Sequence, residues 1–224
     1  MGKNIILAAC AAAITLAAVP ANAALVKLGT ADTGSSIPFD TYLGGYYFSQ
    51  IYSKSQFGTG GSINQISFYN SAYPGGNPGT GNFTLWLGTS SAAIPTFDNG
   101  GNFVFPDASF TQVFSGTLPS IAGGALTLNL STSFNYDASQ NLVLIIRNTD
   151  LSGDGNLFLD YDNNSTAYMN SRFSAYNYDN NGGLVTGFNV APVPEPASWA
   201  LMVGGLGIAG GMLRNRRRLS ARFA

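Results

Sequence analysis

The sequence predicts an all-β domain, an antiparallel β-sandwich or jelly roll, between an N-terminal signal peptide and a single C-terminal transmembrane helix. Three observations support this prediction. Short runs of alternating apolar and polar residues recur along the middle of the chain, turn-forming residues separate them, and no long helical pattern lies between residues 24 and 190. Many short strands at regular spacing, joined by such turns, are typical of sandwiches and barrels.

Residues 1–23 have the three-part build of a secretory signal peptide. Lys3 gives a positive start, residues 5–18 are apolar, and Pro20 ends any helix before the small residues Ala21 and Ala23. The triplet that ends at Ala23 has the A-x-A pattern of a cleavage site. We therefore expect the chain to be exported and cleaved after Ala23.

Two alternatives to this cleavage are disfavoured. An uncleaved anchor needs a longer apolar core than this one, which is short and rich in small residues. A lipoprotein signal at Cys10 would leave only three apolar residues between Asn4 and Ala8, too few for its hydrophobic region.

Cleavage removes Cys10, the only cysteine, and the chain contains no histidine. The mature chain then has no disulfide and no thiol chemistry. It also lacks the commonest means of zinc binding and of histidine-dependent catalysis.

Residues 24–188 are predicted to form one domain, the β-sandwich itself. The charge of this part is low: Lys27, Lys54, Arg147 and Arg172 stand against ten aspartates, a net of about −6. A nucleic-acid interface needs a clustered basic face, so we expect no nucleic-acid partner.

Alternation predicts the strands of this domain one by one. In "ALTLNL" the three leucines share one face and the polar residues share the other, as in a half-buried strand. "LVLII" is apolar on both faces, which suits a central strand. Turn signals separate the runs, for example "YPGGNPGTG" at residues 73–81. The predicted strands are residues 46–52, 62–69, 82–88, 110–116, 125–130, 141–147 and 156–162.

The body of the chain resembles a β-rich module of secreted bacterial surface and adhesin-like proteins. The resemblance covers residues 46–150 and rests on "YFSQIY", "INQISFY", "VFSG" and "FNYDASQNLVLII" in that order. It implies a sandwich that is displayed outside the cell.

Catalysis in the mature chain would depend on aspartates, because Glu195 is the only glutamate. Asp160 and Asp162 are two residues apart and share a face of the predicted strand. Glycoside hydrolysis usually needs paired carboxylates on opposite sides of a cleft. We therefore favour an acidic turn or strand end and predict no catalytic site.

The stretch "DLSGDGNLFLD" places oxygen ligands at alternate positions, Asp150, Ser152 and Asp154, as in the first half of an EF-hand loop. Tyr161 takes the place of the bidentate glutamate, and no flanking helices are predicted. An Asp/Gly turn is favoured. The alternative is a structural Ca²⁺ held by Asp150 and Asp154, together with Asp160 or Asp162; no other cofactor is expected.

Tyrosines are plentiful, and exposed tyrosine rings can contact the faces of sugars. Their ordinary role is packing on the pleated surfaces of strands. The tyrosines considered for sugar contact are Tyr46, Tyr47, Tyr52, Tyr168, Tyr176 and Tyr178.

After the domain, residues 189–196 read as an extended, proline-rich connector. Residues 197–213 follow without a charge, and as a helix they measure about 25 Å, at the lower end of the transmembrane range. A basic tail, residues 214–224, places the C-terminus in the cytoplasm by the positive-inside rule. The stop signal consists of Arg214, Arg216, Arg217 and Arg218.

The segment "VPEPASWALMVGGLGIAGGMLRNRRR", residues 193–218, resembles the PEP-CTERM sorting signal. The resemblance implies that an exosortase-type membrane protease recognises and processes the chain in a Gram-negative bacterium that makes exopolysaccharide. It assigns recognition to Pro194, Glu195 and Pro196 and the stop signal to the four arginines.

Three functions are compatible with these features. The favoured one is an exported, non-catalytic protein of the cell surface or extracellular matrix, held at the inner membrane before processing and linked to exopolysaccharide or biofilm. The second is a stable single-pass protein with a periplasmic binding domain. The third is a secreted enzyme that acts on polysaccharide through aspartate carboxylates.

Overall fold

The computed structural model describes residues 23–39, 45–94, 104–149, 155–165, 167–174, 178–179, 182–192 and 202–210. Several residues singled out in the sequence lie outside these ranges: the signal-peptide residues up to 22, including Ala21, the motif residues 194–196, the terminal arginines, Asp150 and Asp154. Ala23 is exposed and lies directly before the first strand.

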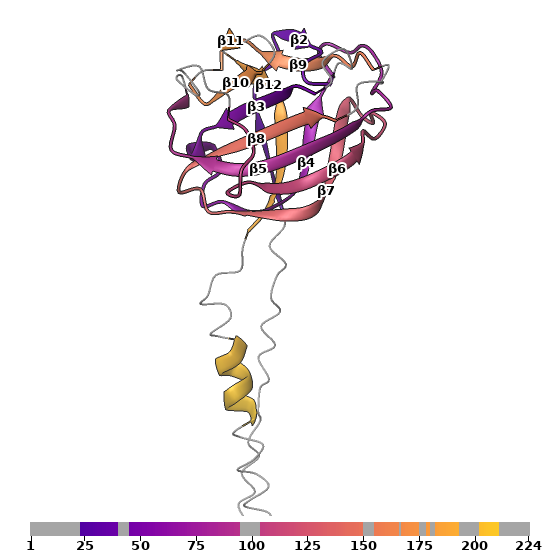
Figure 1. The fold of residues 1–224 in the computed structure, drawn as a ribbon. Coiled ribbons are helices and arrows are strands. Elements are labelled where there is room, and N and C mark those ends of the chain that lie inside the picture. The colour runs from indigo at the N-terminus through magenta and orange to yellow at the C-terminus, as the bar shows by residue number, and fades with distance from the viewer. Residues whose placement is uncertain are drawn as a thin grey trace, which may run out of the picture.

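The described chain is built of antiparallel strands (Figure 1). A four-stranded sheet has the order β1-β13-β4-β7. Its strands are β1 Ala24–Leu28, β13 Thr186–Ala191, β4 Gly61–Tyr69 and β7 Ala125–Tyr136. A six-stranded sheet has the order β11-β10-β3-β8-β5-β6. Its strands are β11 Tyr178–Asp179, β10 Met169–Phe173, β3 Tyr47–Tyr52, β8 Asn141–Asn148, β5 Asn82–Ser90 and β6 Thr111–Thr117.

A small third sheet has the order β12-β9-β2. Its strands are β12 Gly183–Leu184, β9 Leu159–Asp162 and β2 Thr33–Ser35. Outside the sheets, a 3-10 turn at Lys54–Gln56 lies between β3 and β4. Every pairing between these strands is antiparallel. The predicted all-β, antiparallel class is therefore confirmed, while the choice between sandwich and jelly roll stays a prediction.

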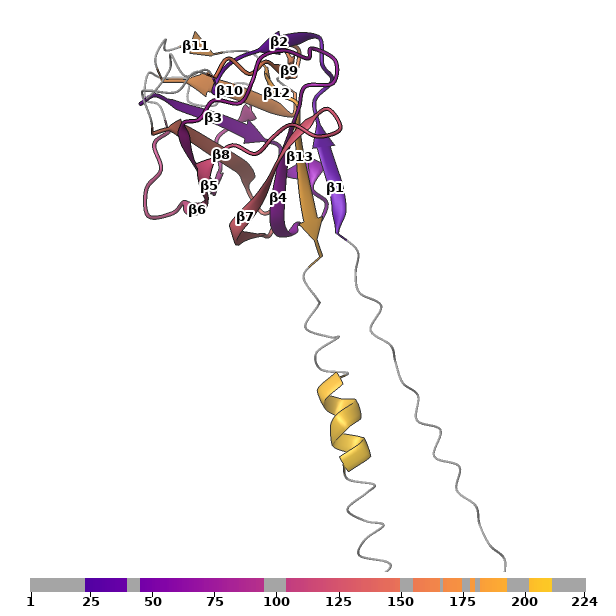
Figure 2. The same cartoon turned by 90° about the vertical axis from the view of Figure 1, so that its right-hand side faces the viewer.

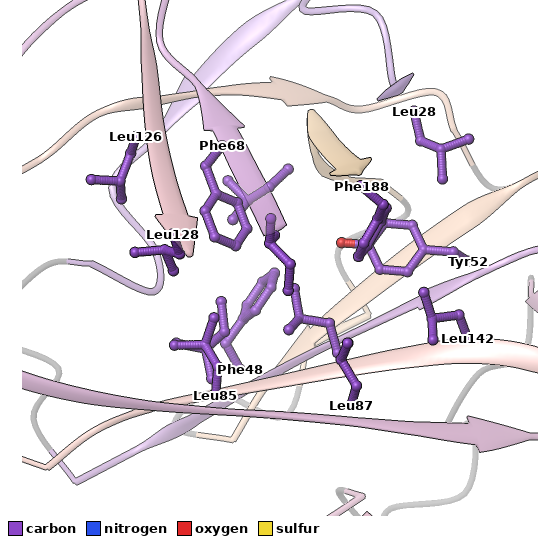
Figure 3. Close-up of a cluster of buried hydrophobic side chains, with 14 of the residues drawn as sticks. Leu28, Phe48, Tyr52, Phe68, Leu85, Leu87, Leu126, Leu128, Leu142 and Phe188 are labelled. Atoms are coloured by element: carbon purple, nitrogen blue, oxygen red, sulfur yellow. The ribbon is translucent and has the colours of Figure 1, made fainter. Parts of the chain in front are cut away.

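The two larger sheets share one hydrophobic core. Their strands cross at a steep angle in Figure 1. Figure 3 shows Phe68, Leu126 and Phe188 of the four-stranded sheet among side chains of the six-stranded sheet. The latter include Phe48, Tyr52, Leu85, Leu87 and Leu142. Burial of this apolar surface is the main force that holds the sheets together.

Strand β8 explains why "LVLII" is apolar on both faces. It lies between β3 and β5 in the middle of the six-stranded sheet. Because side chains alternate along a strand, its apolar residues divide between the two faces of the sheet. Leu144 and Ile146 belong to the main core, whereas Val143 and Ile145 belong to a second cluster with Ile51.

Strand β13 extends into the segment that the sequence assigned to the connector. The connector was predicted from residue 189, but Asn189, Val190 and Ala191 are in the strand, which pairs with β4 and β1. Tertiary pairing explains the difference, because the prolines that disrupt regular structure begin only at Pro192.

Residues 202–210, inside the predicted transmembrane segment 197–213, form a helix with exposed side chains. Among the described residues, no helix has both the length and the apolar character needed to cross a membrane. The other residues of the predicted segment lie outside the described ranges.

The first and last strands of the domain lie side by side. Ala24 pairs with Val190 and Leu28 with Thr186, so β1 begins where β13 ends. Figures 1 and 2 show these two ends at one pole of the domain and the small sheet of β2, β9 and β12 at the opposite pole. The domain therefore joins its C-terminal segment at one pole and presents the small sheet at the other.

Candidate functional site

An open groove of about 300 Å³ lies at the pole of the small sheet. Its lining residues are Gly34, Tyr73, Pro74, Gly75 and Phe158. The two aromatic side chains are accessible to solvent, with exposed fractions of 39% for Tyr73 and 43% for Phe158. The groove is thus an exposed, uncharged surface with two aromatic side chains.

Tyr73 is held at both its backbone and its ring. Its N–H donates to Oδ1 of Asp160 over 2.8 Å. Its hydroxyl donates to the backbone carbonyl of Asp32 over 2.5 Å. These bonds fix the ring against the small sheet, although Tyr73 belongs to the connection between β4 and β5.

Phe158 points outward because side chains alternate along the strand that leads into β9. Its neighbours Leu157 and Leu159 are fully buried. The Phe158 N–H donates to the carbonyl of Gly75 over 3.0 Å, which ties this strand to the same connection that carries Tyr73.

Gly34 of β2 forms the part of the groove between the two rings. A Cβ at this position would lie 3.0 Å from Cβ of Tyr73 and 3.7 Å from Cδ1 of Phe158. A side chain here would push Tyr73 away by a few tenths of an ångström, so the close approach favours glycine.

The carboxylate of Asp160 organises the connection beside the groove. Asp160 is only 2% exposed. It accepts hydrogen bonds from the backbone N–H groups of Ser71, Ala72 and Tyr73, and from the Ser71 hydroxyl. Hydrogen bonds to a charged acceptor are stronger than those between neutral groups. Three successive N–H groups bound to one carboxylate fix the backbone conformation of residues 71–73.

Asp162, the other aspartate of β9, is engaged elsewhere and is 4% exposed. It accepts hydrogen bonds from Thr30 N (2.8 Å) and Asn164 N (2.9 Å). It also accepts a hydrogen bond from the Tyr168 hydroxyl (2.6 Å). Both carboxylates are therefore buried acceptors that fix neighbouring segments. Asp162 ends β9, whereas Asp160 lies inside the strand and not at its end or in a turn.

The calcium hypothesis stays a prediction, because Asp150 and Asp154 lie outside the described residues. Asp160 and Asp162, the further ligands considered, are occupied by the hydrogen bonds given above. Within the described ranges, no group of three or more histidine, cysteine, aspartate or glutamate side chains is arranged to hold a metal ion.

The tyrosines considered for sugar contact are mostly used in packing. Tyr52 is fully buried and donates to Thr186 Oγ1. Tyr47 packs edge-on against Phe105 and lies under the guanidinium of Arg147. Tyr46 is 46% exposed and contacts Phe173. Tyr176 and the side chain of Tyr178 lie outside the described part.

Sequence reasoning missed both aromatic residues of the groove. Phe158 could have been found, because it is the outward residue between Leu157 and Leu159 in "NLFLDYD". Tyr73 stands at the start of "YPGGNPGTG", which was interpreted only as a turn.

Burial raises the pKa of Tyr161 and of Tyr168 to about 12 each. The nearby negative charge of Asp162 acts in the same direction, while the hydrogen bond with Ser171 lowers the pKa of Tyr161. A raised folded-state pKa favours the folded state below the pKa of the unfolded chain, about 10. This stability is lost as the pH rises from about 10 through 12.

We therefore expect the free energy of unfolding to fall between pH 10 and pH 12 and to be insensitive to these groups below pH 9. Urea unfolding across this range, with tyrosinate absorbance followed in parallel, measures the effect. Tyr168→Phe should make the fall shallower. A profile that stays flat to pH 12 would contradict the expectation.

A model of the PEP-CTERM protein-sorting motif matches residues 192–218. A comparison of the chain with curated proteins gives no match. The matched region contains the residues on which the resemblance to this signal was based, so the recognition of the signal is confirmed. The motif implies a protein that is sorted by an exosortase to the cell envelope, surface or exterior.

Proposed function

We propose that this protein is an exported, non-catalytic component of the cell surface or extracellular matrix of a Gram-negative bacterium, associated with exopolysaccharide or biofilm. The observation that supports the proposal is the sorting motif over residues 192–218. The β-domain is the cargo, and the C-terminal segment directs its delivery.

In this proposal the C-terminal segment acts first as an anchor and then as a processing signal. Residues 197–213 hold the chain in the inner membrane, and the arginines after Leu213 stop its export. Pro194 and Pro196 keep the backbone extended around Glu195, the form in which proteases bind a substrate. An exosortase-type protease then releases the domain.

The composition supports a non-catalytic cargo. After signal cleavage the chain holds neither cysteine nor histidine, and Glu195 lies in the motif itself. The buried carboxylates of Asp160 and Asp162 already accept several hydrogen bonds each. Their use as hydrogen-bond acceptors that position neighbouring segments supports the proposal of a non-catalytic cargo.

The mass of the protein in membrane and extracellular fractions tests the proposal. We expect an extracellular form that lacks the residues after the Pro-Glu-Pro motif. Glu195→Ala should cause the full-length form to accumulate in the membrane, while Arg222→Ala, outside the matched residues, should leave processing unchanged.

Detection of only full-length, membrane-bound protein in the unaltered strain would contradict release. That result favours the alternative of a stable single-pass protein with a periplasmic binding domain.

A further inference from the structure

We propose that the groove between Tyr73 and Phe158 binds the apolar face of an uncharged pyranose unit within a polysaccharide. This inference rests on the proposed function and names the site and the ligand class for its polysaccharide association. Four features of the groove support it: the aromatic rings, the polar groups at the rim, the charge and the position on the domain.

Two half-exposed aromatic rings beside a glycine form a surface suited to a flat ligand. A pyranose ring presents C–H groups on a face and hydroxyls around its edge, and the face of an aromatic ring packs against such C–H groups. Small-molecule sites are generally concave and mainly apolar, with a few polar groups that orient the ligand. The groove has this composition.

The ring of Tyr73 and the backbone of Phe158 are fixed before any ligand arrives. Tyr73 is held through its N–H by Asp160 and through its hydroxyl by the carbonyl of Asp32. Phe158 is held by its backbone bond to Gly75. Binding to a preorganised surface loses less conformational entropy than binding to a mobile one.

Polar groups for the sugar hydroxyls stand at the rim. Asn156 is exposed and alternates with Leu157, so its side chain is on the same face as Phe158. Its Oδ1 accepts from Asn77 N, which leaves the amide NH₂ as a donor for a hydroxyl. The phenolic oxygen of Tyr73 donates to Asp32 and retains an acceptor site.

Charge favours a neutral ligand. None of the five lining residues is ionisable except the phenol of Tyr73. The nearby Asp32 carboxylate is negative, although both its oxygens accept hydrogen bonds, from Asn163 N and Asn164 Nδ2. With a net charge of about −6 for the domain, a polymer of uronic acids would be repelled.

The position of the groove separates it from the processing signal. Its lining residues Gly34 and Phe158 belong to β2 and to the approach to β9, and these strands lie at the pole opposite the start of β1 and the end of β13 (Figures 1 and 2). The groove is therefore far from the end of β13, after which the sorting motif follows, so it stays accessible both before and after processing.

The test uses the protein recovered from the extracellular fraction, or the full chain in detergent where it is not released. Calorimetric titration compares dextran and a neutral galactomannan with polygalacturonate, and with exopolysaccharide purified from the producing cells. We expect binding to a neutral polymer and to the exopolysaccharide, and none to polygalacturonate.

Phe158→Ala and Tyr73→Ala should each lower the affinity by about tenfold or more, as the loss of a central aromatic contact does. The matched controls are Phe105→Ala and Tyr46→Ala, because these side chains are 55% and 46% exposed outside the groove. The controls should keep full affinity. Melting curves of all four variants check that the fold is intact.

Equal affinity of the groove variants and the controls would overturn the inference while the exopolysaccharide association stands. Binding to polygalacturonate alone would overturn the ligand class. Failure of the unaltered protein to bind any of the polymers would contradict the proposed association itself, and with it the inference.

Discussion

Phe188→Ala is expected to lower the free energy of unfolding by about 3–5 kcal/mol, the usual cost of removing a large buried aromatic side chain. Phe188 is 0% exposed. Its ring packs edge-on against Tyr52 and Phe57, with centroid distances of 4.9 and 5.5 Å. It thereby connects the two larger sheets (Figure 3). Urea unfolding followed by tryptophan fluorescence measures the loss.

Leu25→Ala is the matched control for this prediction. Leu25 lies on β1, pairs with Asn189 of β13, and is 60% exposed. Its loss should change the free energy of unfolding by no more than about 0.5 kcal/mol, as for most surface substitutions. Similar losses in both variants would show that the core does not depend on Phe188.

Asp160→Asn is expected to cost about 3 kcal/mol of folding stability with little change in volume. The carboxylate accepts from three backbone N–H groups through both oxygens. An asparagine has one oxygen, and its NH₂ group would face N–H donors that it cannot satisfy. Hydrogen bonds to charged groups contribute about 1.5–3 kcal/mol each, and a buried donor without a partner adds a further cost.

Asp107→Asn provides the comparison, because Asp107 is exposed and accepts from Ser109 at the surface. Its cost should be clearly smaller than that of Asp160→Asn, because water replaces the lost hydrogen bonds at the surface. Asp160→Asn should also increase protease cleavage within residues 70–81, since the bonds that fix Ser71, Ala72 and Tyr73 are lost. Unfolding curves that match those of the unaltered protein would remove the structural role given to Asp160.

Alternation along the chain located the main strands well. All seven predicted runs contain strands, and the boundaries of β3, β4 and β8 differ from the prediction by a single residue. Strand β7 was predicted for residues 125–130 but continues to Tyr136. Its register with β4 shifts between Ile63 and Gln65. Such a shift depends on the partner strand, which local alternation does not describe.

Alternation of apolar and polar residues does not reveal a strand whose buried side chains are partly polar. Strand β10 reads Met-Asn-Ser-Arg-Phe and is buried along its whole length. Asn170 donates to the carbonyl of Ile94, and Ser171 bonds with the Tyr161 hydroxyl. Residues outside the strand therefore bond with the side chains of Asn170 and Ser171, and hydropathy alone cannot reveal a strand of this kind.

The groove as a whole could not be predicted from the sequence, although alternation gives the outward position of Phe158. The prediction placed Asp160 at a strand end or turn, but its partner Tyr73 is 87 residues away along the chain. The pairing of β9 with β2, the bond of Phe158 to Gly75 and the bonds of Asp160 to residues 71–73 bring these residues together. The spacing of strands along the chain does not determine which strands pair.

The place of β13 between β1 and β4 determines how the domain responds to mechanical load. A pull on the C-terminal segment acts along the axis of β13, and its hydrogen bonds to both neighbours run across that axis. Both sets of hydrogen bonds, to β1 and to β4, then share the load in shear. In unzipping, by contrast, the hydrogen bonds would break one pair at a time. Until the C-terminal segment is cut, a pull on it therefore loads the domain in its more resistant direction.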